Sequence, residues 1–233
     1  MRNKILILFA LLMFSANMPA YAQDTAPEHS EGPHSFNLHI GGGIGLPVGT
    51  TSNFAGLTGT FQVGAGPNLN AHSSIVGEFM WHGLPPTRNV LAVLVNPLIA
   101  SGLPSNVSTS SNLNALTANY MFHKEGRRYG YYVVGGGGWY YRHTALNNYT
   151  LAPGTVCQPA WDWWGYTCQN GLVSTSNTLA TRGVSSGGVN GGIGITLNLS
   201  EGFRFYMEAR YHYSPQGGHI STQVLPVTFG FRW

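Results

Sequence analysis

The sequence has few charged side chains and no long apolar run beyond its first residues. Asp, Glu, Lys and Arg make up only 8% of the 233 residues, against about 25% in an ordinary soluble domain. So few charges could hardly cover a water-soluble surface. After residue 22, no apolar stretch reaches the roughly 20 residues that a transmembrane helix needs. If the chain spans a membrane, the structure that remains is a closed β-barrel.

The amino-terminal residues match a secretory signal. Arg2 and Lys4 precede an apolar run, and residues 20–22, Ala-Tyr-Ala, fit an A-x-A cleavage site. We therefore expect a signal peptide over residues 1–22 and a flexible polar leader over residues 23–34. Cleavage would leave nine basic and eight acidic side chains. This near-neutral charge argues against a nucleic-acid partner.

Apolar and polar residues alternate strictly in much of the remaining chain. Period-two alternation predicts strands whose two faces meet different surroundings. The eight alternating segments cover residues 36–46, 57–63, 75–82, 116–122, 129–142, 189–199, 203–213 and 226–233. The sequence thus predicts an all-β fold of eight strands over residues 35–233.

The connections between these segments are alternately short and long. Short ones cover residues 66–73, 124–128 and 200–202, and longer ones cover residues 47–55, 83–111, 143–185 and 214–222. An even number of strands with short turns at one end and long loops at the other predicts an antiparallel transmembrane barrel in a bacterial outer membrane. The leader and both chain ends would then be periplasmic, and loops 83–111 and 143–185 extracellular.

One apolar segment leaves the topology open. Residues 90–103, VLAVLVNPLIASGL, are too short to span a membrane as a helix, and Pro97 interrupts them. The segment has three possible placements: packed above the barrel, inserted at the lipid interface, or extended upward as a hairpin. The last arrangement would give a barrel of ten strands instead of eight.

Two stretches resemble a known family. RFYMEARYHY (204–213) and LPVTFGFRW (225–233) are similar to the last two strands of small eight-stranded outer-membrane barrels of the OmpA/OmpX type. The resemblance implies that the barrel-assembly machinery reads the alternating carboxy-terminal side chains. In this sequence those side chains are Val227, Phe229, Phe231 and Trp233, where a final Trp replaces the usual Phe.

Several charged residues have the parity of the barrel interior. An arginine that faces lipid near the bilayer midplane costs about 2–4 kcal/mol, so these residues are expected to point inward and to pair. The predicted lumenal charges are Glu78, Arg142, Arg204, Glu208, Arg210 and Arg232. We expect a salt-bridged plug, and the alternative is a narrow channel for ions or small solutes.

The long segment over residues 143–185 contains both cysteines. In an exported chain, Cys157 and Cys168 are expected to form a disulfide. Between them lie four rigid aromatics, Trp161, Trp163, Trp164 and Tyr166. Such a group could bind a protein or a glycan, or could pack as a lid over the barrel.

Other chemistry finds less support in the sequence. His39, His82 and His212 have inward parity but come from separated strands, so no metal site and no cofactor are expected. An outer-leaflet lipid hydrolase or acyltransferase would need a serine, a histidine and an acidic group together at the rim. His143 and the serines near Ser185 lack such an acid. We therefore expect a monomeric, non-enzymatic protein in contact with outer-membrane lipid, with a structural or adhesive role.

Overall fold

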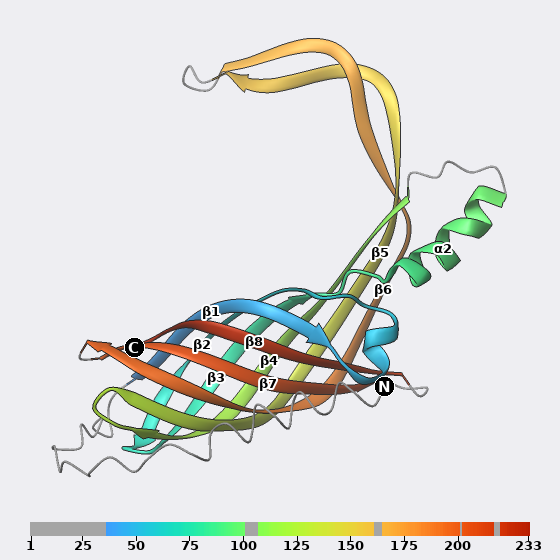
Figure 1. The fold of residues 1–233 in the computed structure, drawn as a ribbon. Coiled ribbons are helices and arrows are strands. Elements are labelled where there is room, and N and C mark those ends of the chain that lie inside the picture. Colours follow the sequence, from blue (N-terminus) through green and yellow to red (C-terminus); the bar gives the residue numbers. More distant parts are fainter. Residues whose placement is uncertain (1–35, 101–106, 161–164, 201, 217–219) are drawn as a thin grey trace.

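The described part of the chain closes into a β-barrel. The computed structural model describes residues 36–100, 107–160, 165–200, 202–216 and 220–233. The predicted signal peptide and leader lie outside these residues. The strands are β1 (Phe36–Pro47), β2 (Thr58–Asn70), β3 (Ser73–Gly83), β4 (Val107–Glu125), β5 (Tyr129–Ala160), β6 (Gly165–Ser200), β7 (Phe203–Gln216) and β8 (Ile220–Arg232). Figure 1 shows their arrangement.

Each strand pairs antiparallel with its neighbours in chain order, and β1 pairs with β8 to close the ring. Closure extends to the last residue, because Leu38 and Trp233 exchange backbone hydrogen bonds of 3.1 and 2.8 Å. A closed ring leaves no unpaired strand edge in the barrel wall. The predicted class, an antiparallel barrel of eight strands, is confirmed, and the ten-stranded alternative is wrong.

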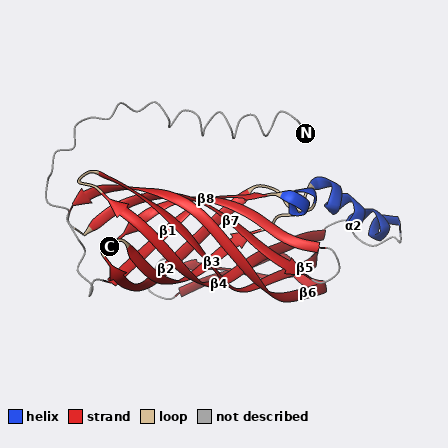
Figure 2. Cartoon of the chain, turned by 90° about the horizontal axis from the view of Figure 1, so that it is seen from below, coloured by secondary structure: helices blue, strands red, loops and turns tan. Residues whose placement is uncertain are grey.

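The two ends of the barrel differ. The short turns after β2 and β4 lie at the same end as Phe36 and Trp233, which we call the closed end. The opposite end, the mouth, bears the long connections, as the turned view in Figure 2 shows. There a short 3₁₀ helix, η2 (Gly49–Asn53), follows β1.

Residues 88–100 form the helix α2 (Arg88–Ala100) at the mouth. Helix, rather than hairpin, is the outcome for most of the apolar segment whose placement the sequence left open. Apolar and polar residues do not alternate along this segment. As a strand, it would therefore not have had one apolar and one polar face. Among the described residues, no helix is long and apolar enough to cross a membrane.

Much of the segment over residues 143–185 is not an open loop. β5 and β6 remain paired from the barrel wall up to the Ala160–Gly165 pair. Beyond Asn148 on β5 and before Val189 on β6, neither strand pairs with a second neighbour. We call this part, residues 149–160 of β5 and 165–188 of β6, the ribbon. It projects from the mouth and curves back (Figure 1). Both faces of the ribbon are exposed, so its polar sequence does not alternate with apolar residues. For this reason the sequence predicted a loop there.

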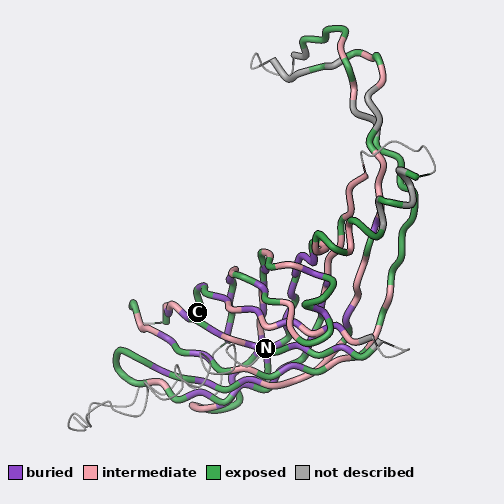
Figure 3. The backbone as a smooth tube through the Cα atoms, turned by 45° about the vertical axis from the view of Figure 1, so that its right-hand side comes forward, coloured by how far each residue is buried: buried purple, intermediate pink, exposed green. Residues whose placement is uncertain are grey.

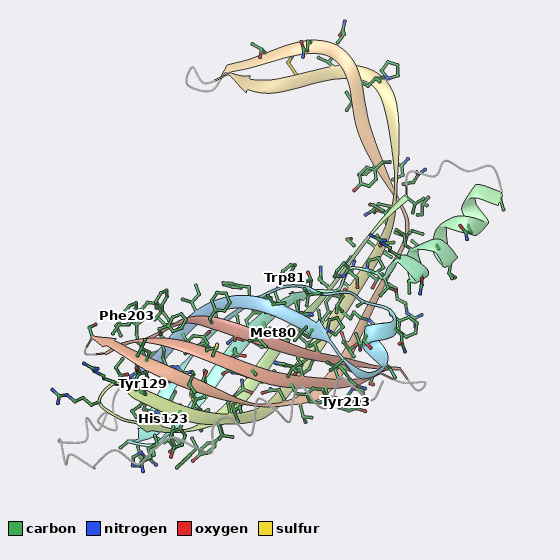
Figure 4. All side chains as sticks on the ribbon, viewed as in Figure 1. Met80, Trp81, His123, Tyr129, Phe203 and Tyr213 are labelled. Atoms are coloured by element: carbon green, nitrogen blue, oxygen red, sulfur yellow. A yellow bond between two sulfur atoms is a disulfide. The ribbon has the colours of Figure 1, made fainter. Side chains whose placement is uncertain are left out.

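Burial along the wall is inverted relative to a soluble protein. Among the described residues, 23 buried side chains are polar or charged and 13 are hydrophobic. Figure 3 shows buried positions alternating with intermediate or exposed ones along the wall strands. Met80 and Trp81, labelled in Figure 4, are neighbours in β3 and have 1% and 40% of their surface exposed. The lumen is therefore mainly polar, and the outer surface is apolar.

Candidate functional site

A hydrogen-bonded network of charged side chains crosses the middle of the lumen. Glu78 on β3 accepts a hydrogen bond of 2.6 Å from Arg210 Nη1 on β7 and lies 2.9 Å from His39 Nε2 on β1. Arg210 Nη2 donates to Glu208 Oε2 at 2.9 Å. The hydroxyl of Tyr132 on β5 donates to the same oxygen, also at 2.9 Å. These five residues, the lumenal network, join four strands across the interior.

The lumenal network is almost completely sealed from solvent, because none of its residues is more than 2% exposed. Moving an ion out of water is costly, and its attraction to an opposite charge offsets that cost only when the hydrogen bonds are good. An eight-stranded barrel has an interior just wide enough for its own side chains. This arrangement can hold strands together and fill the lumen.

A second group of charges lies on the closed-end side of the network. The guanidinium carbon of Arg232 is 4.3 Å from the ring centroid of Tyr132 and 5.3 Å from that of Tyr206, which are cation–π distances. Glu125 accepts a hydrogen bond of 2.8 Å from Thr196. Its carboxylate also lies within electrostatic reach of Arg204 and Arg232.

The charges of the lumen balance. The described residues include three carboxylates, Glu78, Glu125 and Glu208, and all three take part in these interior contacts. Three arginines share the interior with them: Arg204, Arg210 and Arg232, each at most 8% exposed. The described cations elsewhere are Lys124, Arg127 and Arg128 at the closed end, and Arg88, Arg142 and Arg182 toward the mouth.

Arg142 does not join the lumenal network, contrary to the prediction. It is half-buried at the mouth, opposite Leu113 and Val184, and donates a hydrogen bond of 3.3 Å to Thr222 Oγ1. The inward parity is right, but Arg142 is ten residues farther along β5 than Tyr132, the member of the network on that strand. Arg142 therefore lies high on the wall rather than among the central charges.

The three histidines that were predicted to face inward, His39, His82 and His212, are buried but have different surroundings. His39 contacts Glu78, and His212 Nδ1 lies 3.0 Å from the hydroxyl of Tyr140. His82 is fully buried near the mouth, beneath Gly45, where a side chain would overlap its ring. Among the described residues, no three His, Cys, Asp or Glu side chains group as metal ligands.

In the ribbon, Cys157 and Cys168 lie directly opposite each other and form a disulfide. Trp161, Trp163 and Trp164 lie outside the described residues. Tyr166 belongs to β6, where it is opposite Pro159. The predicted binding role of these four aromatics therefore stays a prediction.

The carboxy-terminal strand presents its aromatic side chains outward. Phe229, Phe231 and Trp233 are 52%, 40% and 44% exposed, whereas Val227 is half-buried. Phe231 stacks on Phe203 of β7 with 5.1 Å between ring centroids. The predicted assembly signal is thus displayed on one face of the barrel, and its recognition stays a prediction.

The sequence did not single out Tyr132, Glu125 or His123, all of which point inward. His123 and Glu125 continue the inward-facing positions of the segment over residues 116–122. They were missed because the turn residues Gly126-Arg127-Arg128 suggested that the strand had already ended. Tyr132 is followed closely by four consecutive glycines, residues 135–138. Because glycines carry no side chain, the sequence does not reveal which residues of this strand face inward. Tyr131 and Val133, both more than half exposed, settle that parity in the structure.

The fold has known counterparts among solved structures. No family model matches the chain, and no curated protein is significantly similar to it. Neisserial surface protein A aligns over 84% of this chain and 95% of its own, at 9% identity and a TM-score of 0.50. Ail, the attachment invasion locus protein of Yersinia pestis, aligns over 87% of this chain and 99% of its own, at 12% identity and a TM-score of 0.43. The N-terminal β-barrel domain of Pseudomonas aeruginosa OprF aligns over 87% of this chain and 100% of its own, at 12% identity and a TM-score of 0.44.

The likeness to Neisserial surface protein A, together with the closed ring of eight strands, defines the class of fold. It is the small eight-stranded barrel of outer-membrane proteins. The resemblance that the last two strands indicated is therefore confirmed for the fold.

Proposed function

We propose that this chain is an outer-membrane β-barrel whose lumen is plugged and whose mouth and ribbon serve a structural or binding role at the cell surface. Its outer surface supports the membrane placement. Between the two rims, no described outward-facing residue is charged. Aromatic residues lie toward both ends of the wall, and Figure 4 labels Phe203 and Tyr129 near one end and Tyr213 near the other. Such aromatic girdles mark the two membrane interfaces of outer-membrane barrels.

The proposed orientation places the closed end in the periplasm and the mouth outside the cell. In this class of barrel the short turns face the periplasm and the longer connections face outward. Phe36 and Trp233 would then both be periplasmic, consistent with a leader at residues 23–34. The exposed carboxy-terminal aromatics would be available to the barrel-assembly machinery, and the barrel would work as a monomer.

The observation that favours a plug over a channel is the lumenal network. Its ion pairs join β1, β3 and β7, the Tyr132–Glu208 hydrogen bond adds β5, and its residues are 1–2% exposed. An ion crossing this level would have to displace hydrogen bonds between buried charges, which is costly. A narrow channel, the alternative, requires that this network open.

The binding role is assigned to the ribbon. Its two strands have free outer edges, and exposed edges offer backbone donors and acceptors to an added strand. The Cys157–Cys168 disulfide holds the strands together near the tip. We propose an extracellular protein or glycan as its ligand, with the aromatics between the cysteines as contacts.

The proposed role is not enzymatic. His143 Nε2 lies 3.0 Å from Thr181 Oγ1, so a hydroxyl and an imidazole do meet near the mouth. The three described carboxylates contribute to the interior contacts instead, and none is bonded to His143. A hydrolytic triad needs an acidic group that orients the histidine.

Single-channel recording tests the plug. The mature chain, refolded and inserted into a planar bilayer, is expected to give no discrete current steps. Glu208→Gln weakens the lumenal network, and Arg182→Gln, at an exposed ribbon residue, is the matched control. Steps in the unchanged protein that alter with Glu208→Gln but not with Arg182→Gln would make the protein a small pore.

A shortened ribbon tests the binding role separately. Residues 153–172 would be replaced by a two-residue turn between Ala152 and Val173, which already lie opposite each other. The barrel should still fold, while binding of cells that display the protein to immobilised glycans and extracellular proteins should be lost. Unchanged binding by the shortened protein would reject the ribbon as the binding element.

A further inference from the structure

A cavity of about 250 Å³ lies at the mouth, between the barrel rim and the start of α2. Its apolar lining residues include Phe54, Ala55, Leu84 and Val90, and its polar lining residues include Arg142 and Thr144. The cavity could therefore hold an aliphatic group that carries a charged or polar end.

The cavity has a rigid frame of backbone hydrogen bonds. Gly56 donates to Pro85 at 2.8 Å, and Thr87 donates to Phe54 at 2.9 Å, which fastens the β1–β2 connection to the segment before α2. Leu84 in turn donates to Ser111 on β4 at 2.8 Å. Because three parts of the chain are tied together, the apolar lining is held in place by the protein's own backbone hydrogen bonds.

Among the described residues that line this cavity, Arg142 is the only charged one, and no described carboxylate there compensates its positive charge. Its hydrogen bond to Thr222 Oγ1 uses one donor of five and is long, at 3.3 Å. None of the three described carboxylates forms an ion pair with it, since Glu78 and Glu208 bind Arg210 and Glu125 lies near His123. Arg182 is close enough to repel it.

We propose that this cavity binds an aliphatic carboxylate, with the carboxylate on Arg142 and the alkyl chain against Ala55 and Leu84. A guanidinium has a planar fork of donors that matches a carboxylate. A half-buried cation gains most from an anion that can be partly desolvated with it. A neutral alcohol would leave the guanidinium uncompensated, and an alkylammonium would be repelled. The inference needs the cavity and not the plug, so it stands whether or not the lumen conducts.

The test is a methyl NMR titration of the full mature chain in lipid nanodiscs with decanoate. Ala55 and Leu84 report on the cavity, whereas Leu116 and Val133, both more than half exposed on the outer wall, report on decanoate dissolved in the lipid. We expect saturable shifts at Ala55 and Leu84 only. Decanol and decyltrimethylammonium should give saturation that is at least tenfold weaker.

Variants separate the contribution of the Arg142 charge to decanoate binding from that of the cavity volume. Arg142→Gln should weaken decanoate binding about tenfold or more, and Arg142→Lys should lie between it and the wild type. Arg182→Gln, which removes a nearby charge outside the cavity, should change binding by less than about threefold. Ala55→Leu should abolish the saturable shift at Leu84 by filling the cavity. Heat-modifiable migration on gels checks that each variant is folded.

Three results would overturn the proposal. One is the absence of saturation at Ala55 and Leu84 in the folded wild type. Another is equal saturation by decanol and decanoate, which would leave an apolar cavity with no preference for anions. The third is a folded Arg142→Gln variant with wild-type affinity for decanoate.

Discussion

The lumen and the mouth use the same side chain, arginine, in opposite ways. In the lumen, Arg210 is 1% exposed and binds two carboxylates, Glu78 and Glu208. At the mouth, Arg142 is half-buried and Arg182 is exposed, and neither pairs with a described carboxylate. The difference follows from desolvation, because a fully buried charge needs a partner and a partly hydrated one does not. An arginine without a described carboxylate partner is therefore tolerated at the mouth, where its side chain stays partly hydrated.

The wall and the ribbon differ within the same two strands. In the wall, β5 and β6 each have two neighbours, and alternate residues face different surroundings. In the ribbon each has one neighbour, and most described residues from Thr167 to Gly183 are exposed on both faces. Alternation thus reports the presence of two different environments, and not the presence of a strand.

The largest expected effect is on the lumen. Glu78→Ala removes one carboxylate from Arg210 and the partner of His39, and breaking a buried ion pair costs about 3–5 kcal/mol. Urea unfolding of the barrel in lipid vesicles would measure the loss in the free energy of unfolding. Arg182→Ala at the exposed ribbon is the control, with an expected change below about 0.5 kcal/mol. Equal losses would mean that burial does not distinguish the two regions.

A steric change should have the next largest effect. A Cβ added at Gly194 overlaps the ring of Tyr132, which binds Glu208, whereas a Cβ at Gly187 in the same strand meets nothing within 4 Å. Gly194→Ala should therefore cost about 1–3 kcal/mol through overpacking, and Gly187→Ala should be close to neutral. The same urea unfolding experiment measures both variants. A harmless Gly194→Ala would show that Tyr132 can move without cost to the lumenal network.

Much of the wall could be predicted because its chemistry is local. The parity of Arg204, Glu208 and Arg210 follows from alternation and from the cost of a charge in lipid, and all three are buried. Their partners could not be predicted, because the Glu78–Arg210 contact joins residues 132 positions apart. Which interior side chains meet depends on the stagger of the strands around the ring, and one sequence does not reveal it.

The mouth was harder to predict than the wall. The segment over 90–103 is apolar without a decisive period, so helix and hairpin remained open until the structure showed α2. The mouth cavity combines Ala55, Leu84 and Arg142, which belong to three separate segments. Sequence alternation predicts that Arg142 points inward, but it does not predict its position along the barrel axis. That position, near the mouth, separates Arg142 from the lumenal network.

A smaller effect on stability is expected for Arg142 than for its lumenal counterpart. Arg142→Gln removes one long hydrogen bond from a partly hydrated side chain, so the free energy of unfolding should fall by less than about 1 kcal/mol. Arg210→Gln leaves two buried carboxylates without their cation and should cost about 3–5 kcal/mol. A loss for Arg142→Gln as large as that for Arg210→Gln would make Arg142 a structural residue and remove the contrast between mouth and lumen.

The smallest expected effect on the barrel comes from the disulfide. Replacing both cysteines with serine should leave the urea unfolding of the wall unchanged, because the ribbon beyond Asn148 shares no pairing with other wall strands. The effect should instead be local: a disulfide closing so short a loop contributes about 2–3 kcal/mol, so exchange of the Thr155 and Asn170 amides should accelerate about thirtyfold or more. The Ile195 amide, in the wall part of the same strand, should keep its protection. If Ile195 exchanged faster as well, wall and ribbon would be one cooperative unit, and the ribbon would have to be counted as part of what stabilises the barrel.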